Sequence, residues 1–180
     1  WMPNFAFRHY TRLRRVMPRR DLQSLKAWIC CSEPCRHADA VGFEEAYAEA
    51  GVRPGAVLGC YAMAETVFAV TQTPPGTAPR SRNFGHDGEL LNLGGPIDGI
   101  EISIRDCDGR PVPDGRFGEI AVRGAFLFDG YDRDAALTAD RLRGGWYFSR
   151  DRGCLIGGEL YVAGRLDHLN GRFGAVVGDG

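Results

Sequence analysis

Residues 60–66, Cys-Tyr-Ala-Met-Ala-Glu-Thr, have the types and spacing that most clearly favour chemistry. They separate two apolar runs, so Tyr61 and Glu65 fall where a buried strand is expected to reach the surface. Because a desolvated carboxylate needs a partner, a cation or a substrate group is expected beside Glu65. The tyrosine ring is suited to stacking on a flat heterocycle. The pattern favours a nucleotide–metal site; the alternative is a strand-end tyrosine with a solvated glutamate.

Other motifs stand in a definite order around this stretch. Ser32-Glu33-Pro34 lies upstream, and the downstream segments are residues 118–124, 130–131, 145–153 and 158–167. Together they resemble the adenylate-forming superfamily, which includes acyl-CoA synthetases and fatty acyl-AMP ligases. The resemblance extends over residues 1–167, nearly the whole chain. It is specific because five motifs share the family order.

The resemblance implies how an acid, ATP and magnesium would be held. Family members join a carboxylic acid to ATP as acyl-AMP, release pyrophosphate and pass the acyl group to coenzyme A or carrier-protein phosphopantetheine. Glu65 matches the family's Mg²⁺ ligand, and Tyr61 matches the aromatic residue that stacks on adenine. The turn Ser32-Glu33-Pro34 matches the segment that borders adenine and the acyl pocket. Thr66 is expected near the α-phosphate, although the family more often has threonine where Ala64 stands.

Three further residues match positions that bind ribose or guide domain movement. Asp151 matches the acceptor of the ribose hydroxyls, which suits a carboxylate with two acceptor oxygens. Arg165 matches the arginine that reaches ribose or phosphate, and Asp167 matches the hinge. The alternative for Arg165 and Asp167 is a surface ion pair at a strand end. The usual Thr-Gly before the aspartate is Ser149-Arg150 here, and arginine lacks the backbone freedom of glycine.

The N-terminal residues carry a weaker resemblance. Trp1 and residues 3–7 resemble the Pro-Asn-Phe-Ala segment that lines the acyl tunnel of fatty acyl-AMP ligases; the alternative is ordinary core aromatics. A fatty acid is therefore the preferred substrate, and an acyl carrier protein is a candidate partner. The family's phosphate loop and catalytic lysine are expected upstream and downstream of this chain, since no lysine follows Lys26. The alternative function is an inactive nucleotide-binding remnant.

Composition is ordinary for a globular protein: 180 residues, 44% hydrophobic, 25% charged, with a net charge of −1. This charge predicts no recruitment of nucleic acid. The sequence has no apolar run near the ~20 residues of a membrane span and no signal peptide, so a cytoplasmic location is expected.

Arginines gather near the N-terminus, which we interpret as a solvated helix face. Zinc is disfavoured because Cys30, Cys31, Cys35 and His37 form one ligand set only, and buried reduced thiols are the better interpretation.

The elements that must position these residues change in character along the chain. A strand at 25–31, a helix at 38–50 that stops at Gly51, and a strand at 57–60 predict a parallel crossover. Residues 72–93 are expected to be irregular. From residue 99 the pattern predicts antiparallel strands at 100–104 and 117–122 and short strands at 146–148, 154–156 and 160–162, with a tight hairpin at Gly157-Gly158. A short helix is expected at 138–142, with Asp134 or Thr138 as its cap. The predicted fold is α/β followed by antiparallel β: an α/β subdomain portion (1–95), a barrel-like subdomain (96–164) and a hinge with the start of a small domain (165–180).

Overall fold

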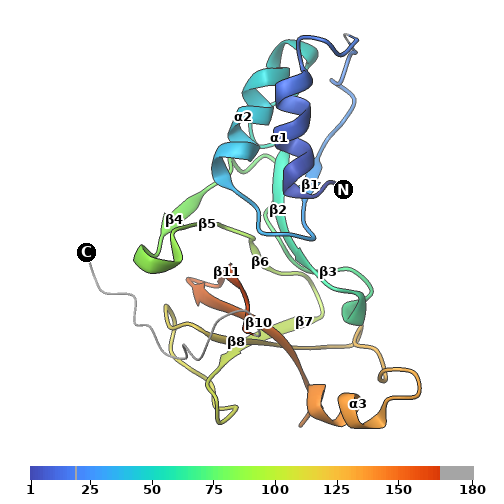
Figure 1. Cartoon of the computed structure of the whole chain (residues 1–180), viewed down its shortest axis with the longest axis vertical. Helices are drawn as coiled ribbons and strands as arrows, with labels where there is room; N and C mark the ends of the chain where they lie inside the picture. Colours follow the sequence, from blue (N-terminus) through green and yellow to red (C-terminus); the bar gives the residue numbers. More distant parts are fainter. Residues whose placement is uncertain (19, 167–180) are drawn as a thin grey trace. The chain divides into compact units, whose positions relative to one another are not determined.

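The computed structural model describes residues 1–18 and 20–166, which form two compact units. The first unit comprises Trp1–Tyr61 and Thr71–Gly94, and the second comprises Ala62–Val70 and the segment from Gly95 onward. Figure 1 labels their helices and strands. Within the described residues, none of the helices combines the length and apolar character needed to span a bilayer.

The first unit is the α/β part of the chain. It contains α1 (Asn4–Leu13), β1 (Trp28–Cys30), α2 (His37–Tyr47), the short 3-10 turn η1 (Ala48–Ala50), most of β2 (Val57–Ala62) and the end of β3 (Ala69–Gln72). Strands β1 and β2 are parallel, with Trp28 opposite Val57 and Cys30 opposite Gly59. Since α2 connects them, the predicted crossover is confirmed.

Aromatic packing holds the two helices of the first unit together. Helices α1 and α2 lie side by side (Figure 1), and the rings of Phe7 and Phe43 meet edge to face at 5.2 Å. Both rings are buried, so Phe7 is a core aromatic. The helical segment ends at Gly51, which has a φ of 95°. Glycine adopts this left-handed conformation without a Cβ penalty, which explains the predicted stop.

The second unit is mainly antiparallel β, as predicted. It contains the 3-10 turn η2 (Ala64–Thr66), β6 (Gly95–Pro96), β7 (Ile100–Arg105), β8 (Gly118–Gly124), α3 (Ala135–Arg141), β9 (Leu142–Arg143), β10 (Trp146–Ile156) and β11 (Glu159–Arg165). The sheet order is β11-β10-β8-β7, with β9 on β10. Side chains of Ile120, Val122 and Leu160 are fully buried in its core. The predicted hairpin at Gly157-Gly158 is present, with φ values of 58° and 80°.

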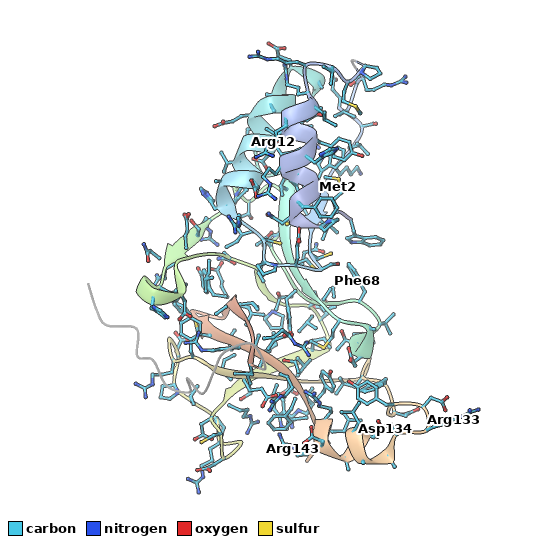
Figure 2. All side chains as sticks on the ribbon, in the orientation of Figure 1. Met2, Arg12, Phe68, Arg133, Asp134 and Arg143 are labelled. Carbon is cyan, nitrogen blue, oxygen red and sulfur yellow. The ribbon has the colours of Figure 1, made fainter. Side chains whose placement is uncertain are left out.

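Helix α3 begins at a side-chain cap that the sequence predicted as one of two candidates. The carboxylate of Asp134 accepts a hydrogen bond from the backbone N–H of Leu137 at 2.9 Å, and Figure 2 labels this aspartate before the helix. Thr138, the other candidate, lies inside the helix instead. Its hydroxyl donates to the carbonyl of Asp134 and accepts from the N–H of Tyr131, so it ties the preceding loop to the first turn.

Two segments differ from the sequence prediction. The connection at 72–93 is not wholly irregular, because β4 (Ser81–Asn83) and β5 (Glu89–Leu91) pair as a hairpin around the 3-10 turn η3 (Gly85–Asp87). The first strand, β4, consists of polar residues, so it lacks the alternation of apolar and polar residues on which strand prediction depends. The strands expected at 146–148 and 154–156 are one strand, β10, whose register shifts at Phe148/Arg152 and Arg152/Gly153. The division at residues 95 and 164 stays a prediction about subdomains.

Candidate functional site

Glu65 lies in the second unit, where two tyrosine hydroxyls bind its carboxylate. Tyr131 and Tyr147 donate to Oε1 of Glu65 at 2.8 and 3.0 Å, and their hydroxyl oxygens are 3.0 Å apart. We call these three residues the Glu65 cluster. Phe128 packs edge-on against both tyrosine rings, with centroids 4.8 and 5.7 Å away. Its N–H donates to the carbonyl of Glu65 at 2.9 Å, so backbone and side chain of the glutamate are both held.

The loop that presents Glu65 is closed by its own hydrogen bonds. The N–H of Met63 donates to the carbonyl of Phe68 at 2.9 Å. The buried Thr66 hydroxyl lies 3.2 Å from the Met63 carbonyl and 3.1 Å from that of Phe68. The hydroxyl of Thr66 therefore already has acceptors within the loop. Its predicted contact with an α-phosphate remains a prediction.

The surroundings of Glu65 keep its carboxylate ionised. Desolvation is the largest influence and raises its pKa, but hydrogen bonds from Tyr131, the backbone and Tyr147, with the positive charge of Arg165, together leave the pKa below its ordinary value. Burial and the neighbouring phenol and carboxylate raise the pKa of Tyr147. Tyr147 therefore stays protonated and remains a donor near neutral pH. The cluster consists of one anion and two neutral donors.

The donor set of the cluster fits a magnesium ion. Both phenols bind Oε1, so Oε2 of Glu65 takes part in neither bond. Mg²⁺ in nucleotide sites commonly takes one or two carboxylate oxygens and completes its shell with phosphate oxygens and water. Among residues 1–18 and 20–166, no group of three or more His, Cys, Asp or Glu could hold a metal by itself. A metal at Glu65 would therefore depend on ligand oxygens from a bound phosphate.

Asp151 and Arg165 lie in the same unit and form an ion pair. They stand opposite each other on β10 and β11, with Nη1 of Arg165 3.2 Å from Oδ1 of Asp151. Asp151 is the more buried partner, at 15% side-chain exposure against 49% for Arg165. Since Arg165 also lowers the pKa of Glu65, its charge acts on both carboxylates. The structure thus pairs Arg165 with Asp151, and the ribose role of both residues remains a prediction.

The backbone before Asp151 keeps the conformation that a glycine would favour. Arg150 has a φ of 63°, in the left-handed region that costs an L-residue roughly 1–2 kcal/mol. Its N–H donates to the buried carboxylate of Glu119 at 2.8 Å. The Ser149 hydroxyl donates to the carbonyl of Ile120 and accepts the N–H of Asp151. These hydrogen bonds stabilise the turn, so Arg150 adopts the left-handed conformation although it is not a glycine.

The remaining predicted residues lie in the first unit, after two adjacent parallel strands. Ser32, with a φ of 72°, begins the turn that follows β1, and Tyr61 is buried near the end of β2. Because parallel neighbours end at the same edge, the turn and Tyr61 share that edge. A carboxylate oxygen of Glu33 accepts the N–H of Phe5, which links the turn to α1.

Four residues are expected around one nucleotide: Ser32 and Tyr61 lie in the first unit, and Glu65 and Asp151 lie in the second. Their meeting in one cleft stays a prediction. Asp167 lies outside the described residues.

Sequence reasoning missed Tyr131 and Tyr147 as partners of Glu65. Tyr131 stood in a quoted motif, Gly130-Tyr131, and Tyr147 in a predicted strand. The available signal was chemical, because buried tyrosine hydroxyls usually find a hydrogen-bond partner. The residue types alone did not say which acceptor each hydroxyl would meet.

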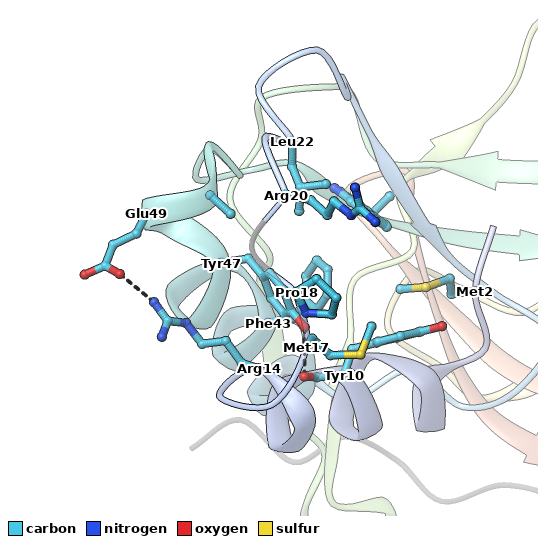
Figure 3. A pocket seen from close by; sticks show the side chains of 12 residues that line it. Met2, Tyr10, Arg14, Met17, Pro18, Arg20, Leu22, Phe43, Tyr47 and Glu49 are labelled. Carbon is cyan, nitrogen blue, oxygen red and sulfur yellow. Dashed lines mark hydrogen bonds and ion pairs between the residues drawn. The ribbon is translucent and has the colours of Figure 1, made fainter.

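The first unit also contains a cavity of ≈ 370 Å³ beside α1 and α2 (Figure 3). Most of its lining side chains are apolar, and the aromatic and thioether ones are Met2, Tyr10, Met17, Trp28, Phe43 and Tyr47. At the rim Arg14 pairs with Glu49 at 2.7 Å, and the Tyr47 hydroxyl donates to the carbonyl of Tyr10 at 3.0 Å. Such a lining suits an apolar ligand. The acyl tunnel predicted at Trp1 and residues 3–7 remains a prediction.

Comparison with known proteins decides the family. The AMP-binding enzyme family matches residues 4–132. The chain belongs to this family. Fatty acid AMP ligase from Legionella pneumophila superposes with a TM-score of 0.83 and 26% identity, over 93% of this chain and 34% of the ligase chain. The predicted fold, the C-terminal part of the large domain of an adenylate-forming enzyme, is confirmed by such neighbours.

Curated relatives of this AMP-binding chain are much longer than the chain. A putative ligase of Mycobacterium tuberculosis is 30% identical over 91% of this chain and 34% of its own length. Atromentin synthetase of Tapinella panuoides is 30% identical over 81% of this chain and 16% of its own length. The chain thus spans about a third or less of these relatives.

Proposed function

We propose that this AMP-binding chain is part of an ATP-dependent ligase that activates a carboxylic acid as acyl-AMP and transfers the acyl group to a thiol. The single observation that carries the proposal is the Glu65 cluster within a chain of this family. Its carboxylate is held ionised by two phenols on one oxygen, which leaves the other oxygen for a cation. In this proposal residues 1–95 and 96–164 are portions of the α/β and barrel-like subdomains, and residues 165–180 begin the hinge.

The residues of the chain would share the work of holding the nucleotide. Tyr61 would stack on adenine beside the turn Ser32-Glu33-Pro34, and Asp151 would accept the ribose hydroxyls. Mg²⁺, when bound at Glu65, would supply charge neutralisation for the phosphates. Arg165 stands beside Asp151 and would add positive charge toward ribose or phosphate. Such a site acts by positioning and electrostatics, since the attacking carboxylate comes from the acid substrate.

We infer a fatty acid as the carboxylic acid. Two relatives support this choice: the Legionella pneumophila ligase and the long-chain-fatty-acid–AMP ligase of Mycolicibacterium smegmatis, which is 27% identical over 93% of this chain. The mostly apolar cavity of the first unit is compatible with an acyl-binding fold. The acceptor thiol would belong to coenzyme A or to the phosphopantetheine of an acyl carrier protein.

Titration of adenine, AMP and ATP against the chain tests the nucleotide site. We expect Tyr61→Ala to weaken AMP and adenine alike by about 1–3 kcal/mol, the usual range for one base–aromatic stack. Asp151→Asn should weaken AMP and leave adenine unchanged, because adenine has no ribose. Asp132→Asn is the matched control, since Asp132 is highly exposed and pairs only with its neighbour Arg133 among the ion pairs of the described chain.

If Asp151→Asn changes the affinities for adenine and AMP equally, Asp151 does not bind the ribose. Undiminished AMP binding by Tyr61→Ala would remove the tyrosine from the base site.

A further inference from the structure

Two cysteine thiols meet across the turn that follows β1. Sγ of Cys30, the last residue of β1, lies 2.6 Å from Sγ of Cys35, just before α2. Both side chains are buried, at 1% and 9% exposure, and both thiols are free. A disulfide requires about 2.03–2.05 Å between its sulfurs, so a shift of about half an ångström would bring them to bonding distance. Their neighbour Cys31 instead has its Sγ 3.5 Å from the Ser32 hydroxyl.

We propose that Cys30 and Cys35 form a reversible disulfide that closes the Ser32-Glu33-Pro34 turn. The oxidant is a low-molecular-weight disulfide such as oxidised glutathione. The Cys35 thiolate attacks one sulfur of this disulfide, forms a mixed disulfide and releases one glutathione thiolate. Cys30 then attacks the Cys35 sulfur and releases the second. The two protein thiols are oxidised, the glutathione disulfide is reduced to two thiols, and the two protons go to the released thiolates.

The chemical surroundings make this pair of thiols slow to react. The hydrogen bond with Cys30, followed by burial, raises the pKa of the Cys35 thiol far above its ordinary value, so little thiolate exists in the closed turn. Reaction therefore requires transient opening of the turn, which a low concentration of urea should accelerate. Reversible disulfides of this kind are typical of redox-sensing sites in reducing compartments.

Because of its location, the disulfide should affect AMP binding. This expectation rests on the proposed function. Three of the four residues between the two cysteines are the ones proposed to border adenine, and Ser32 already has a φ of 72°. A bond between sulfurs that already touch would hold the turn in its present conformation. Pre-organisation of a binding segment reduces the ordering cost of binding. We therefore expect the oxidised chain to bind AMP more tightly than the reduced chain.

Peptide mapping tests the bond directly. Trypsin cleavage after Lys26 and Arg36 places Cys30, Cys31 and Cys35 in one peptide, residues 27–36. After incubation of the folded chain with glutathione disulfide, with and without dilute urea, we expect this peptide to lose two hydrogens and to be alkylated at Cys31 alone. The number of titratable thiols should fall from six to four.

Variants separate the pair from its neighbours. Cys35→Ser should retain free Cys30, whereas Cys107→Ser, at an exposed cysteine, should oxidise as the parent does. Three results would overturn the proposal. They are full alkylation of the peptide both with and without urea, a mixed disulfide as the only product, and a disulfide bond that includes Cys31.

Binding of AMP distinguishes a failure of this proposal from a failure of the proposed function. Tighter AMP binding after oxidation in the parent, and no change in Cys35→Ser, supports the full inference. Disulfide formation without a change in AMP affinity overturns the effect on the turn and leaves the bond itself established. If neither the reduced nor the oxidised chain binds AMP, the proposed nucleotide site fails, while the peptide map still decides the disulfide.

Discussion

Removal of the Tyr147 hydroxyl should destabilise the second unit through Glu65. Tyr147→Phe deletes a hydrogen bond of 3.0 Å to the glutamate and a 3.0 Å contact with the Tyr131 hydroxyl, at a residue that is only 4% exposed. Hydrogen bonds to charged groups contribute about 1.5–3 kcal/mol. Tyr131 still donates to the same carboxylate oxygen, so we expect a loss of about 2 kcal/mol in the free energy of unfolding. Because the two hydroxyls also contact each other, Tyr131→Phe and Tyr147→Phe should combine less than additively.

The pH dependence of this loss identifies the carboxylate as the acceptor. A lowered pKa in the folded state means that Glu65 contributes stability above its unfolded pKa and loses it as pH falls through the lower folded pKa. Urea unfolding of the parent and of Tyr147→Phe at about pH 7 and about pH 3 should therefore show a smaller difference at the acidic pH. Carboxyl NMR titration should show the pKa of Glu65 rising in the variant.

Tyr10→Phe is the matched control for this experiment. Tyr10 is 38% exposed, and its hydroxyl is not one of the two phenol donors to Glu65. We expect a change within about 0.5 kcal/mol. Equal destabilisation by Tyr10→Phe and Tyr147→Phe near neutral pH, or a Tyr147→Phe loss that is the same at both pH values, would refute the argument.

Two further predictions concern the first unit. The buried carboxylate of Glu44 accepts the N–H groups of Gly55 and Val57 at 3.1 and 2.8 Å, so Glu44→Ala should cost about 2–4 kcal/mol in urea unfolding, against about 0.5 or less for exposed Glu45→Ala. Gly94 and Gly76 share φ values near 80°, but a Cβ would lie 2.2 Å from backbone atoms at Gly94 and meet nothing within 4 Å at Gly76. Gly94→Ala should therefore lower the thermal midpoint much more than Gly76→Ala, and equal shifts would contradict the close approach.

Local features of the fold were predictable from the sequence. The alternation in residues 100–104 predicted β7, Gly51 predicted the end of the helical segment, and Gly157-Gly158 predicted the turn between β10 and β11. Each of these depends on the backbone preferences of a few consecutive residues. The order of the motifs likewise predicted the family, since it is a property of the chain itself.

Only the tertiary structure showed how the candidate site is built. The partners of Glu65 lie 66 and 82 residues further along the chain, and the β4–β5 hairpin depends on pairing of the polar strand β4 with β5. The contact between Cys30 and Cys35 depends on the shape of the turn that separates them. From residue type alone one can predict that a buried carboxylate or phenol needs a hydrogen-bond partner. Packing of distant segments decides which atom becomes that partner, because hydrogen bonds form only where the fold brings donor and acceptor within about 3 Å.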